Sequence, residues 1–346
     1  MSRRRLYLDP APGEDRAVVT LDGRPERLLR ARADDPADPP LGARYAARLA
    51  RIDRGLACGF LDLGEGAQAL LALSGPAKTL AEGAALEIEI AAESRRGKLA
   101  QARLIGAGLG PARRLDAPVT LLDRLRAFAP DEPVIEGDEA RERADEADAE
   151  ILAIEHPLPG AGSLSIEPTR ALTAIDVDLG ARTGDAKRLA RQANLTAIHE
   201  AARLLRLKGL GGLVVIDLVG EGHDGAALTE AARAAFAPDQ PGVVLGPVSR
   251  LGLFQLATPR RVQPLSERLC DETGALSAAS LALRLLRALE REGRADRGAR
   301  LLARCAPPVA EAALAYARPL TDSLGPRFEI RADSTLPALR YEVSAS

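Results

Sequence analysis

The sequence predicts a multidomain protein of mixed α/β and α+β architecture, with a small β-barrel near the amino terminus. Five short strand-like runs separated by glycines lie between Tyr45 and Ile105, a spacing typical of a small barrel such as an OB-fold. A β-α-β pattern follows over residues 163–217, and a separate α+β mixture of helical and strand-like runs begins after Cys270. Because 346 residues exceed what one hydrophobic core usually serves, we expect two or three compact units.

Composition excludes several classes of protein. No apolar run approaches the roughly eighteen residues that a membrane span requires, so we expect a soluble chain without membrane contact. Cys58, Cys270 and Cys305 are odd in number and widely spaced, which fits neither a disulfide framework nor a metal knuckle and favours a cytoplasmic setting. The net charge of −2 means that any contact with nucleic acid must come from local basic patches.

Local patterns place the other elements. Residues 4–30 alternate apolar runs around turn signals and predict an opening hairpin, and the Pro- and Asp-rich residues 33–40 predict a connector. The acidic run over residues 136–154 predicts a helix with a solvated face and no chemistry. A longer helix is expected from Asp185 to Leu207, with apolar residues at helical spacing and Gly209 as its stop.

Carboxylates mark the two strands of the β-α-β pattern. In TAIDVD, Asp176 and Asp178 project from one side of the strand, opposite the apolar residues. In LVVIDLV, Asp217 interrupts an aliphatic run, where a buried carboxylate costs several kcal/mol unless it is paired or binds a metal. A right-handed crossover would lay these strands parallel, with Asp176 and Asp217 near their carboxyl ends, where ligands of open α/β sheets collect.

Two interpretations of these carboxylates stay open. Carboxylate oxygens are ligands that magnesium prefers, and a magnesium ion held by few protein groups can accept phosphate oxygens and activate a water. Alternatively, Asp176 and Asp217 cap loops or pair with nearby Arg182. Asp178 could equally be a solvated carboxylate at a strand end.

Three segments resemble the catalytic region of the bacterial ribonuclease E/G family. They are SLSIEPTRALTAIDVD, NLTAIHEAARLLRLKGLGGLVVIDLVGE and SRLGLFQLATPR, in the family's order over about residues 164–265. The resemblance implies a cytoplasmic endoribonuclease that cuts single-stranded RNA by magnesium-dependent hydrolysis in RNA processing or decay, with Mn²⁺ as the alternative metal. It implies metal ligation by Asp176 and Asp217 and assistance by Asp178, where the family has Asn.

The resemblance extends to the amino-terminal part and implies a division of the chain. RIDRGLACGFLDLGEGAQALLAL and ESRRGKLAQARL resemble the family's OB-fold RNA-binding module. The implied domains are residues 1–38 as strands packing on the catalytic part, 39–106 as the OB-fold module, 107–165 as an RNase H-like connecting subdomain, 166–268 as a DNase I-like catalytic subdomain of α/β type, and 269–346 as a small carboxyl-terminal α+β domain.

The same resemblance assigns RNA contacts and shows departures. Phe60 would stack on a base, unless it is a core aromatic, while Lys98 and Arg182 would meet the RNA backbone. Leu70 stands where the family has a second stacking aromatic. The resemblance implies a reduced member, because too few residues follow the barrel for the family's subdomain that recognises the 5′ end of RNA.

The family's zinc-binding cysteine pair is also missing, since Cys270 stands alone. We therefore expect no structural zinc and, if a homodimer forms, one without a zinc link. Two other functions are weighed against the endoribonuclease. A non-catalytic RNA-binding relic is favoured by Leu70 and Asp178. A metal-dependent phosphohydrolase of small substrates would need a closed pocket in place of an open groove.

Overall fold

The computed structural model describes residues 3–32, 38–160, 162–180 and 185–345. Arg182 and most of the expected connector lie outside the described residues. The chain divides into two units, each assembled from separate segments: Met1–Pro36, Val119–Glu146 and Ser266–Ser346 in the first, Ala37–Pro118 and Ala147–Leu265 in the second. Within the described ranges, no helix combines the length and apolar character needed to cross a membrane.

A four-stranded sheet opens the first unit. Its strand order is β10-β1-β2-β3, with β1 at Arg4–Asp9, β2 at Glu14–Leu21, β3 at Arg24–Arg32 and β10 at Val134–Ile135. The expected hairpin is confirmed and continues into a second one, whose two-residue turn Asp22-Gly23 has positive φ at both positions, as the tight turn between twisted strands requires. Helix α1 (Leu121–Arg126) adds Leu125 to the core of this sheet.

The carboxyl-terminal segment of the first unit has a core of its own. Helix α6 (Ala278–Ala295) and helix α7 (Pro307–Leu324) share apolar contacts with a three-stranded sheet of order β18-β17-β19. These strands are β17 (Leu301–Cys305), β18 (Phe328–Ala332) and β19 (Tyr341–Ala345). The elements follow the predicted order of helix, strand, helix and strands. A short helix α5 (Leu265–Leu269) precedes them.

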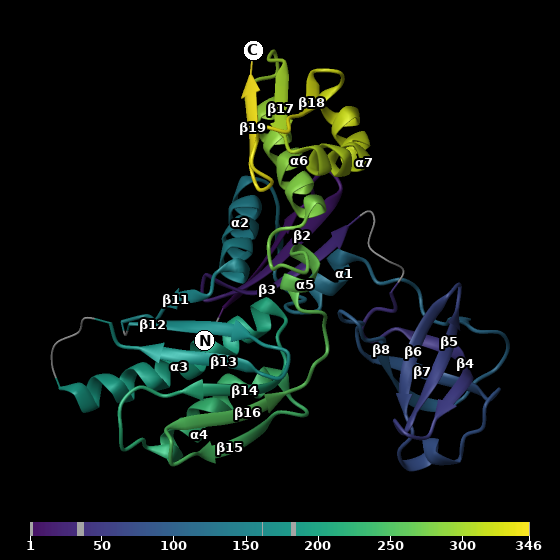
Figure 1. Cartoon of the computed structure of the whole chain (residues 1–346), viewed down its shortest axis with the longest axis vertical. Helices are drawn as coiled ribbons and strands as arrows, with labels where there is room; N and C mark the ends of the chain where they lie inside the picture. Colours follow the sequence, from purple (N-terminus) through teal and green to yellow (C-terminus); the bar gives the residue numbers. More distant parts are fainter. Residues whose placement is uncertain (1–2, 33–37, 161, 181–184, 346) are drawn as a thin grey trace. The chain divides into compact units, whose positions relative to one another are not determined.

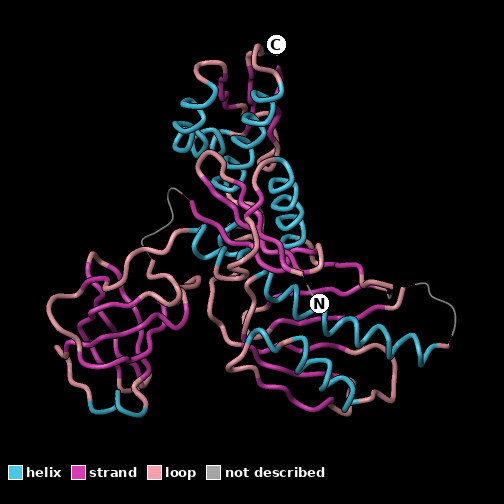
Figure 2. The backbone as a smooth tube through the Cα atoms, turned by 180° about the vertical axis from the view of Figure 1, so that it is seen from behind, coloured by secondary structure: helices cyan, strands magenta, loops and turns pink. Residues whose placement is uncertain are grey.

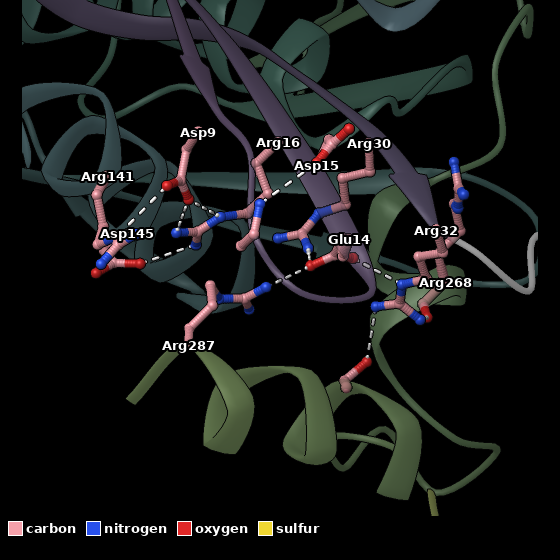
Figure 3. A network of polar contacts seen from close by, with 12 residues as sticks. Asp9, Glu14, Asp15, Arg16, Arg30, Arg32, Arg141, Asp145, Arg268 and Arg287 are labelled. Carbon is pink, nitrogen blue, oxygen red and sulfur yellow. Dashed lines mark hydrogen bonds and ion pairs between the residues drawn. The ribbon is translucent and has the colours of Figure 1, made fainter. Parts of the chain in front are cut away.

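Buried ion pairs join the three segments of the first unit (Figure 3). The Glu14 carboxylate of β2 accepts hydrogen bonds from Arg30 of β3 at 2.7 Å and from Arg287 of α6 at 2.8 Å. Arg16, with a side chain only 1% exposed, donates to Asp9 at 2.6 Å and to Asp145 of helix α2 at 2.8 Å. Charges buried in this way need such partners, because removal from water is costly.

This network corrects one expectation about the acidic run. Helix α2 forms at Asp138–Leu152 as predicted, but its charged residues are not all on a solvated face. Arg141 is largely buried and donates to Asp9 at 3.4 Å and to Glu290 of α6 at 3.1 Å. Ion pairs with distant segments therefore explain part of the charge of this helix.

A closed barrel of five strands forms the first part of the second unit (Figure 1). The hydrogen-bonded order β4-β5-β6-β8-β7 closes because β4 pairs with both β5 and β7. The strands are β4 (Arg44–Asp53), β5 (Cys58–Gly64), β6 (Ala67–Ala72), β7 (Ala85–Ala92) and β8 (Ala100–Ala107). Alternate residues such as Leu49, Leu61 and Ile88 fill the interior. A 3₁₀ helix (Gly75–Thr79) follows β6, and a short strand β9 (Arg113–Arg114) adds to β4.

The rest of the second unit is a six-stranded sheet of order β11-β12-β13-β14-β16-β15. Its strands are β11 (Glu155–Pro157), β12 (Ser163–Pro168), β13 (Thr173–Asp178), β14 (Gly212–Asp217), β15 (Val244–Val248) and β16 (Leu253–Thr258). Helix α3 (Ala186–Lys208) and helix α4 (Gly225–Ala235) run along one face of this sheet (Figure 2), and a 3₁₀ turn follows at Ala237–Asp239.

A buried lysine secures the end of helix α2 within the second unit. The ammonium group of Lys208, at the end of α3, donates to the carbonyl oxygens of Glu150, Ile151 and Ala153 at 2.7 to 2.8 Å. These are carbonyl groups that a helix end leaves without an intrahelical partner. His156 is also buried, and this burial, together with the charge of Lys208, lowers the pKa of its imidazole from 6.5 to about 4.

Candidate active site

Two aspartates meet across the centre of the six-stranded sheet. Strands β13 and β14 are parallel neighbours, and Asp176 stands directly beside Asp217 in their register. Each aspartate lies at or near the carboxyl end of its strand, as the crossover argument predicted. Since neighbouring strands lie about 4.8 Å apart, the two carboxylates project side by side from one face.

The face that carries these aspartates is exposed. In β13 the buried residues Thr173, Ile175 and Val177 alternate with exposed ones, and the buried side faces helix α3. Asp217 is also exposed, and Val215 on the same face of β14 is only half-buried. The expectation that Asp217 is a carboxylate in a buried strand was therefore wrong, because helices cover only one face of this sheet.

A hollow of about 360 Å³ lies over the paired aspartates. Strand β12 supplies Ser165 directly opposite Asp176, and Glu167 two residues further along on the same face. On the other side, Leu253 of β16 stands opposite Asp217. The residues that line the hollow are Ser165, Glu167, Ala174, Ile175, Asp176, Val215, Asp217 and Leu253. Four neighbouring strands therefore contribute to one polar surface.

Asp178 lies two residues beyond Asp176 on the same face and has a local role. It is exposed, and its carboxylate accepts a hydrogen bond from the N–H of Gly180 at 2.8 Å. Its register partner is Ser163, preceded by Gly162 with φ +73°, where a Cβ would lie 1.9 Å from the carbonyl oxygen of Asp178. The chain can pass here only with a glycine. Asp178 is absent from the residues that line the hollow.

Helix α3 holds the loop that follows Asp217. It begins after Asp185, whose side chain accepts from the N–H of Arg188, and it ends at Gly209 in the left-handed conformation, as predicted. Within it, Asn194 is buried and exchanges two hydrogen bonds of 3.0 Å with the backbone of Val219. This bidentate contact fixes the chain two residues beyond Asp217.

Comparison with known proteins assigns this region to a family. Residues 126–261 match the ribonuclease E/G family. Ribonuclease E of Haemophilus influenzae is 38% identical over 146 residues, 39% of this chain and 16% of that protein. These matches identify residues 126–261 as a segment of the ribonuclease E/G type. Ribonuclease E of Escherichia coli is 36% identical over 146 residues, which cover 39% of this chain and 14% of that protein. The chloroplastic ribonuclease E/G-like protein of Arabidopsis thaliana is 32% identical over 141 residues, which cover 37% of this chain and 14% of that protein.

The matched segment contains Asp176, Asp178 and Asp217, so the candidate site lies inside the ribonuclease E/G region. Phe60 and Lys98, which the sequence predicted as RNA contacts, lie outside it. The chain matches only about a seventh of the length of the bacterial ribonuclease E proteins compared here. Similarity alone therefore does not assign the activity or the substrates of those whole proteins to this chain.

Phe60 lies on the outer surface of the barrel. It alternates along β5 with the buried Leu61, so the alternative of a core aromatic was wrong. The guanidinium carbon of Arg51 lies 4.0 Å from the centre of the Phe60 ring. Lys98 is exposed in the tight turn between β7 and β8, where Arg95 and Lys98 exchange backbone hydrogen bonds. Of the three residues that the sequence proposed for RNA binding, Phe60 is thus half-buried and Lys98 is exposed, while Arg182 lies outside the described residues.

Sequence reasoning missed Ser165, Glu167 and Asn194. The alternation of SLSIEP contained the signal for the first two, because it places Ser165 and Glu167 on the same side of β12. Asn194 could have been noticed as a polar residue on the apolar side of the predicted helix. Across the described residues, no group of three or more His, Cys, Asp or Glu side chains could hold a metal ion.

Proposed function

We propose that this protein is an endoribonuclease that hydrolyses single-stranded RNA in the cytoplasm, during RNA processing or decay. The pairing of Asp176 with Asp217 on an exposed sheet face, inside the ribonuclease E/G segment, carries the proposal. The relatives named ribonuclease E support the reaction class. An exposed face also suits a polymer, which must lie across its enzyme and cannot enter a closed pocket.

The two aspartates fit a magnesium ion, with manganese as the alternative. Magnesium is usually bound through one or two carboxylates, with water and substrate phosphates completing its coordination. Asp176 and Asp217 offer two exposed carboxylates from adjacent strands. When bound there, the ion would polarise the phosphodiester and lower the pKa of an attacking water.

The chain's own residues have separate tasks around this pair. Asn194 holds the loop after Asp217, which keeps the end of β14 in register with β13. Ser165 offers a hydroxyl group directly opposite Asp176, where it can donate to a phosphate oxygen. Asp178 assists by shaping the turn at Gly180, while its charge opposes the approach of phosphate.

The barrel would bind the RNA. Numbered along the chain, its five strands follow the closed order 1-2-3-5-4, and we propose that it is an OB-fold module. Phe60 would stack on a base and Lys98 would meet a phosphate, as in other proteins that bind single strands. Cys270, which is half-buried, offers one thiolate per chain, so a homodimer would form without a zinc link.

The proposal is tested by incubating the purified protein with a labelled single-stranded oligoribonucleotide, with magnesium or with a chelator. Endonucleolytic products should form only with magnesium or manganese. An RNA-binding relic would retain the oligonucleotide without cutting it, a reading that Leu70 beside Phe60 favours. A phosphohydrolase of small substrates would release phosphate from p-nitrophenyl phosphate and leave the RNA intact. Either result would overturn the proposal.

A further inference from the structure

A row of side chains crosses the outer surface of the barrel. Arg51 of β4 stands opposite Phe60 of β5, Phe60 stands opposite Leu70 of β6, and Leu70 stands opposite Gln101 of β8. Each of the four is exposed or half-buried, in contrast to the adjacent inward row. A planar cation, an aromatic ring, an aliphatic side chain and an amide thus follow one another across four neighbouring strands.

Arg51 is exposed at one end of this row. Among the described residues, its side chain forms no recorded ion pair or hydrogen bond, and its contact is the ring of Phe60 at 4.0 Å. The carboxylates nearby along the strands are engaged elsewhere. Asp53 accepts from a backbone N–H at 3.0 Å, and Asp62 does so at 2.9 Å. Arg51 therefore places a positive charge and a flat surface over the ring of Phe60.

Bases of single-stranded RNA stack on aromatic rings and on guanidinium planes alike. A leucine offers no such plane, so the row has only one aromatic platform. We propose that Arg51 is an RNA-binding residue that forms a joint stacking surface with Phe60 and holds the adjacent phosphate. This inference rests on the proposed function, since it names a further residue for binding the same single-stranded RNA.

The geometry gives Arg51 two separable contributions. The guanidinium plane contacts the ring and can extend the stack by one base, which an ammonium group cannot do. Its N–H donors form a planar fork that suits two phosphate oxygens. The first contribution depends on planarity, and the second depends on charge. Substitutions that change one and keep the other therefore distinguish them.

The test measures binding of a short fluorescein-labelled single-stranded RNA by anisotropy, with a chelator present so that no RNA is cut. Arg51→Lys keeps the charge and loses the plane, so it should weaken binding about tenfold with an unchanged salt dependence. Arg51→Gln should weaken binding at least as much and lower the slope of log affinity against log salt by about 0.7, the value for one phosphate contact on a single strand.

Arg48→Gln is the matched control. Arg48 is exposed on the same strand and loses the same charge, but it bonds the carbonyl oxygen of Gly83 and does not stack. Its affinity should stay within about twofold of wild type. Equal losses of RNA affinity in Arg48→Gln and Arg51→Gln would show that only overall charge matters and would overturn the inference. Wild-type RNA affinity in Arg51→Lys would overturn it as well.

A second pair of variants separates direct contact from support of the ring. If Arg51 touches the RNA, then Arg51→Gln must still lower the salt slope when Phe60→Leu is already present. No further change in that background would make Arg51 a positioning residue and overturn the proposal. A wild-type chain that fails to bind RNA also overturns it. A chain that binds with these dependences but never cuts defeats the proposed endoribonuclease and leaves the inference standing.

Discussion

Carboxylates have opposite surroundings in the two units. In the first unit, Glu14 is fully buried and is held by Arg30, Arg32 and Arg287 at 2.7 to 2.8 Å (Figure 3). In the second unit, Asp217 lies on an exposed strand face, and no ion pair is recorded for it among the described residues. A buried acid must be paired to be tolerated, whereas an exposed, unpaired acid remains available to a cation or a substrate.

The difference separates stability from chemistry. The Glu14 network joins strand β2 to helix α6 and thereby ties together segments far apart in the sequence. The Asp176 and Asp217 side chains do not join separate segments, since backbone hydrogen bonds already hold β13 against β14. Substitutions in the Glu14 network should therefore lower the free energy of unfolding, whereas substitutions of Asp176 or Asp217 should lower the rate of catalysis.

The largest effect is expected from Asp217→Asn, which keeps the side-chain volume and removes one of the two paired charges. Loss of several kcal/mol of transition-state stabilisation should lower the cleavage rate on the order of a thousandfold or more. Single-turnover cleavage of a labelled oligonucleotide measures it. Glu230→Gln, a change at an exposed glutamate of α4, is the matched control and should cut at the wild-type rate. Near-wild-type cleavage by Asp217→Asn would remove Asp217 from the mechanism.

Glu14→Gln should produce the largest loss of stability. Burial raises the pKa of Glu14, but the charges of Arg30, Arg287 and Arg32 outweigh burial and hold it well below its usual range. The carboxylate is therefore ionised in the folded protein at neutral pH. Its removal leaves buried arginines uncompensated, which costs about 3–5 kcal/mol of unfolding free energy.

Urea unfolding followed by circular dichroism measures this loss. Asp217→Asn serves as the comparison and should change the free energy of unfolding by less than about 0.5 kcal/mol, as exposed substitutions usually do. Equal stability losses in the two variants would break the division between the regions. So would a Glu14→Gln protein as stable as wild type.

Local patterns predicted the parts of the fold that local physics decides. The alternation in TAIDVD placed Asp176 and Asp178 on one face, and Asp185 and Gly209 marked the ends of helix α3. The exposure of Asp217 could not be predicted, because it depends on whether another layer covers that face of the sheet. A continuous aliphatic run usually indicates a strand covered on both faces, and β14 departs from that rule because Leu213 and Val215 continue the run on its uncovered face.

Long-range contacts set a second limit on prediction. Glu14 and Arg287 are 273 positions apart, and nothing near either residue in the sequence indicates its partner. The outward position of Phe60 likewise depends on the barrel register, which shifts between Leu49 and Arg51 of β4. The sequence could identify these residues as charged or aromatic. Only the assembled sheets decide which of them meet.

A smaller effect is expected from the buried imidazole of His156. Burial, with the charge of Lys208, lowers its folded pKa to about 4, against 6.5 for the unfolded chain. The folded state therefore favours the neutral ring, and its stability is complete above pH 6.5 and declines as pH falls toward 4. Between pH 7 and pH 5 the protein should lose about 2 kcal/mol of unfolding free energy from this group.

Urea unfolding at both pH values measures the loss. His156→Gln cannot titrate and should remove most of that difference. His199→Gln, a change at an exposed histidine of α3, should leave it intact. If His156→Gln keeps the full pH dependence, then the loss arises from other groups and the neutral buried imidazole is excluded as its source.

The smallest effect is expected from Asp178→Asn. Asn retains a side-chain oxygen that can accept the hydrogen bond from Gly180, so the turn after β13 should keep its shape. It also removes a negative charge two residues beyond Asp176, on the face that a phosphate would approach. Cleavage at saturating magnesium should therefore stay within about threefold of wild type or rise, a change of less than about 1 kcal/mol in the barrier.

Asp178→Ala provides the contrast, since it removes both the charge and the acceptor and should lower the cleavage rate more than Asp178→Asn does. Cleavage rates of the two variants over a magnesium titration measure the difference. An inactive Asp178→Asn protein with wild-type unfolding would instead make Asp178 a required ligand, and the site would then hold its metal with three carboxylates.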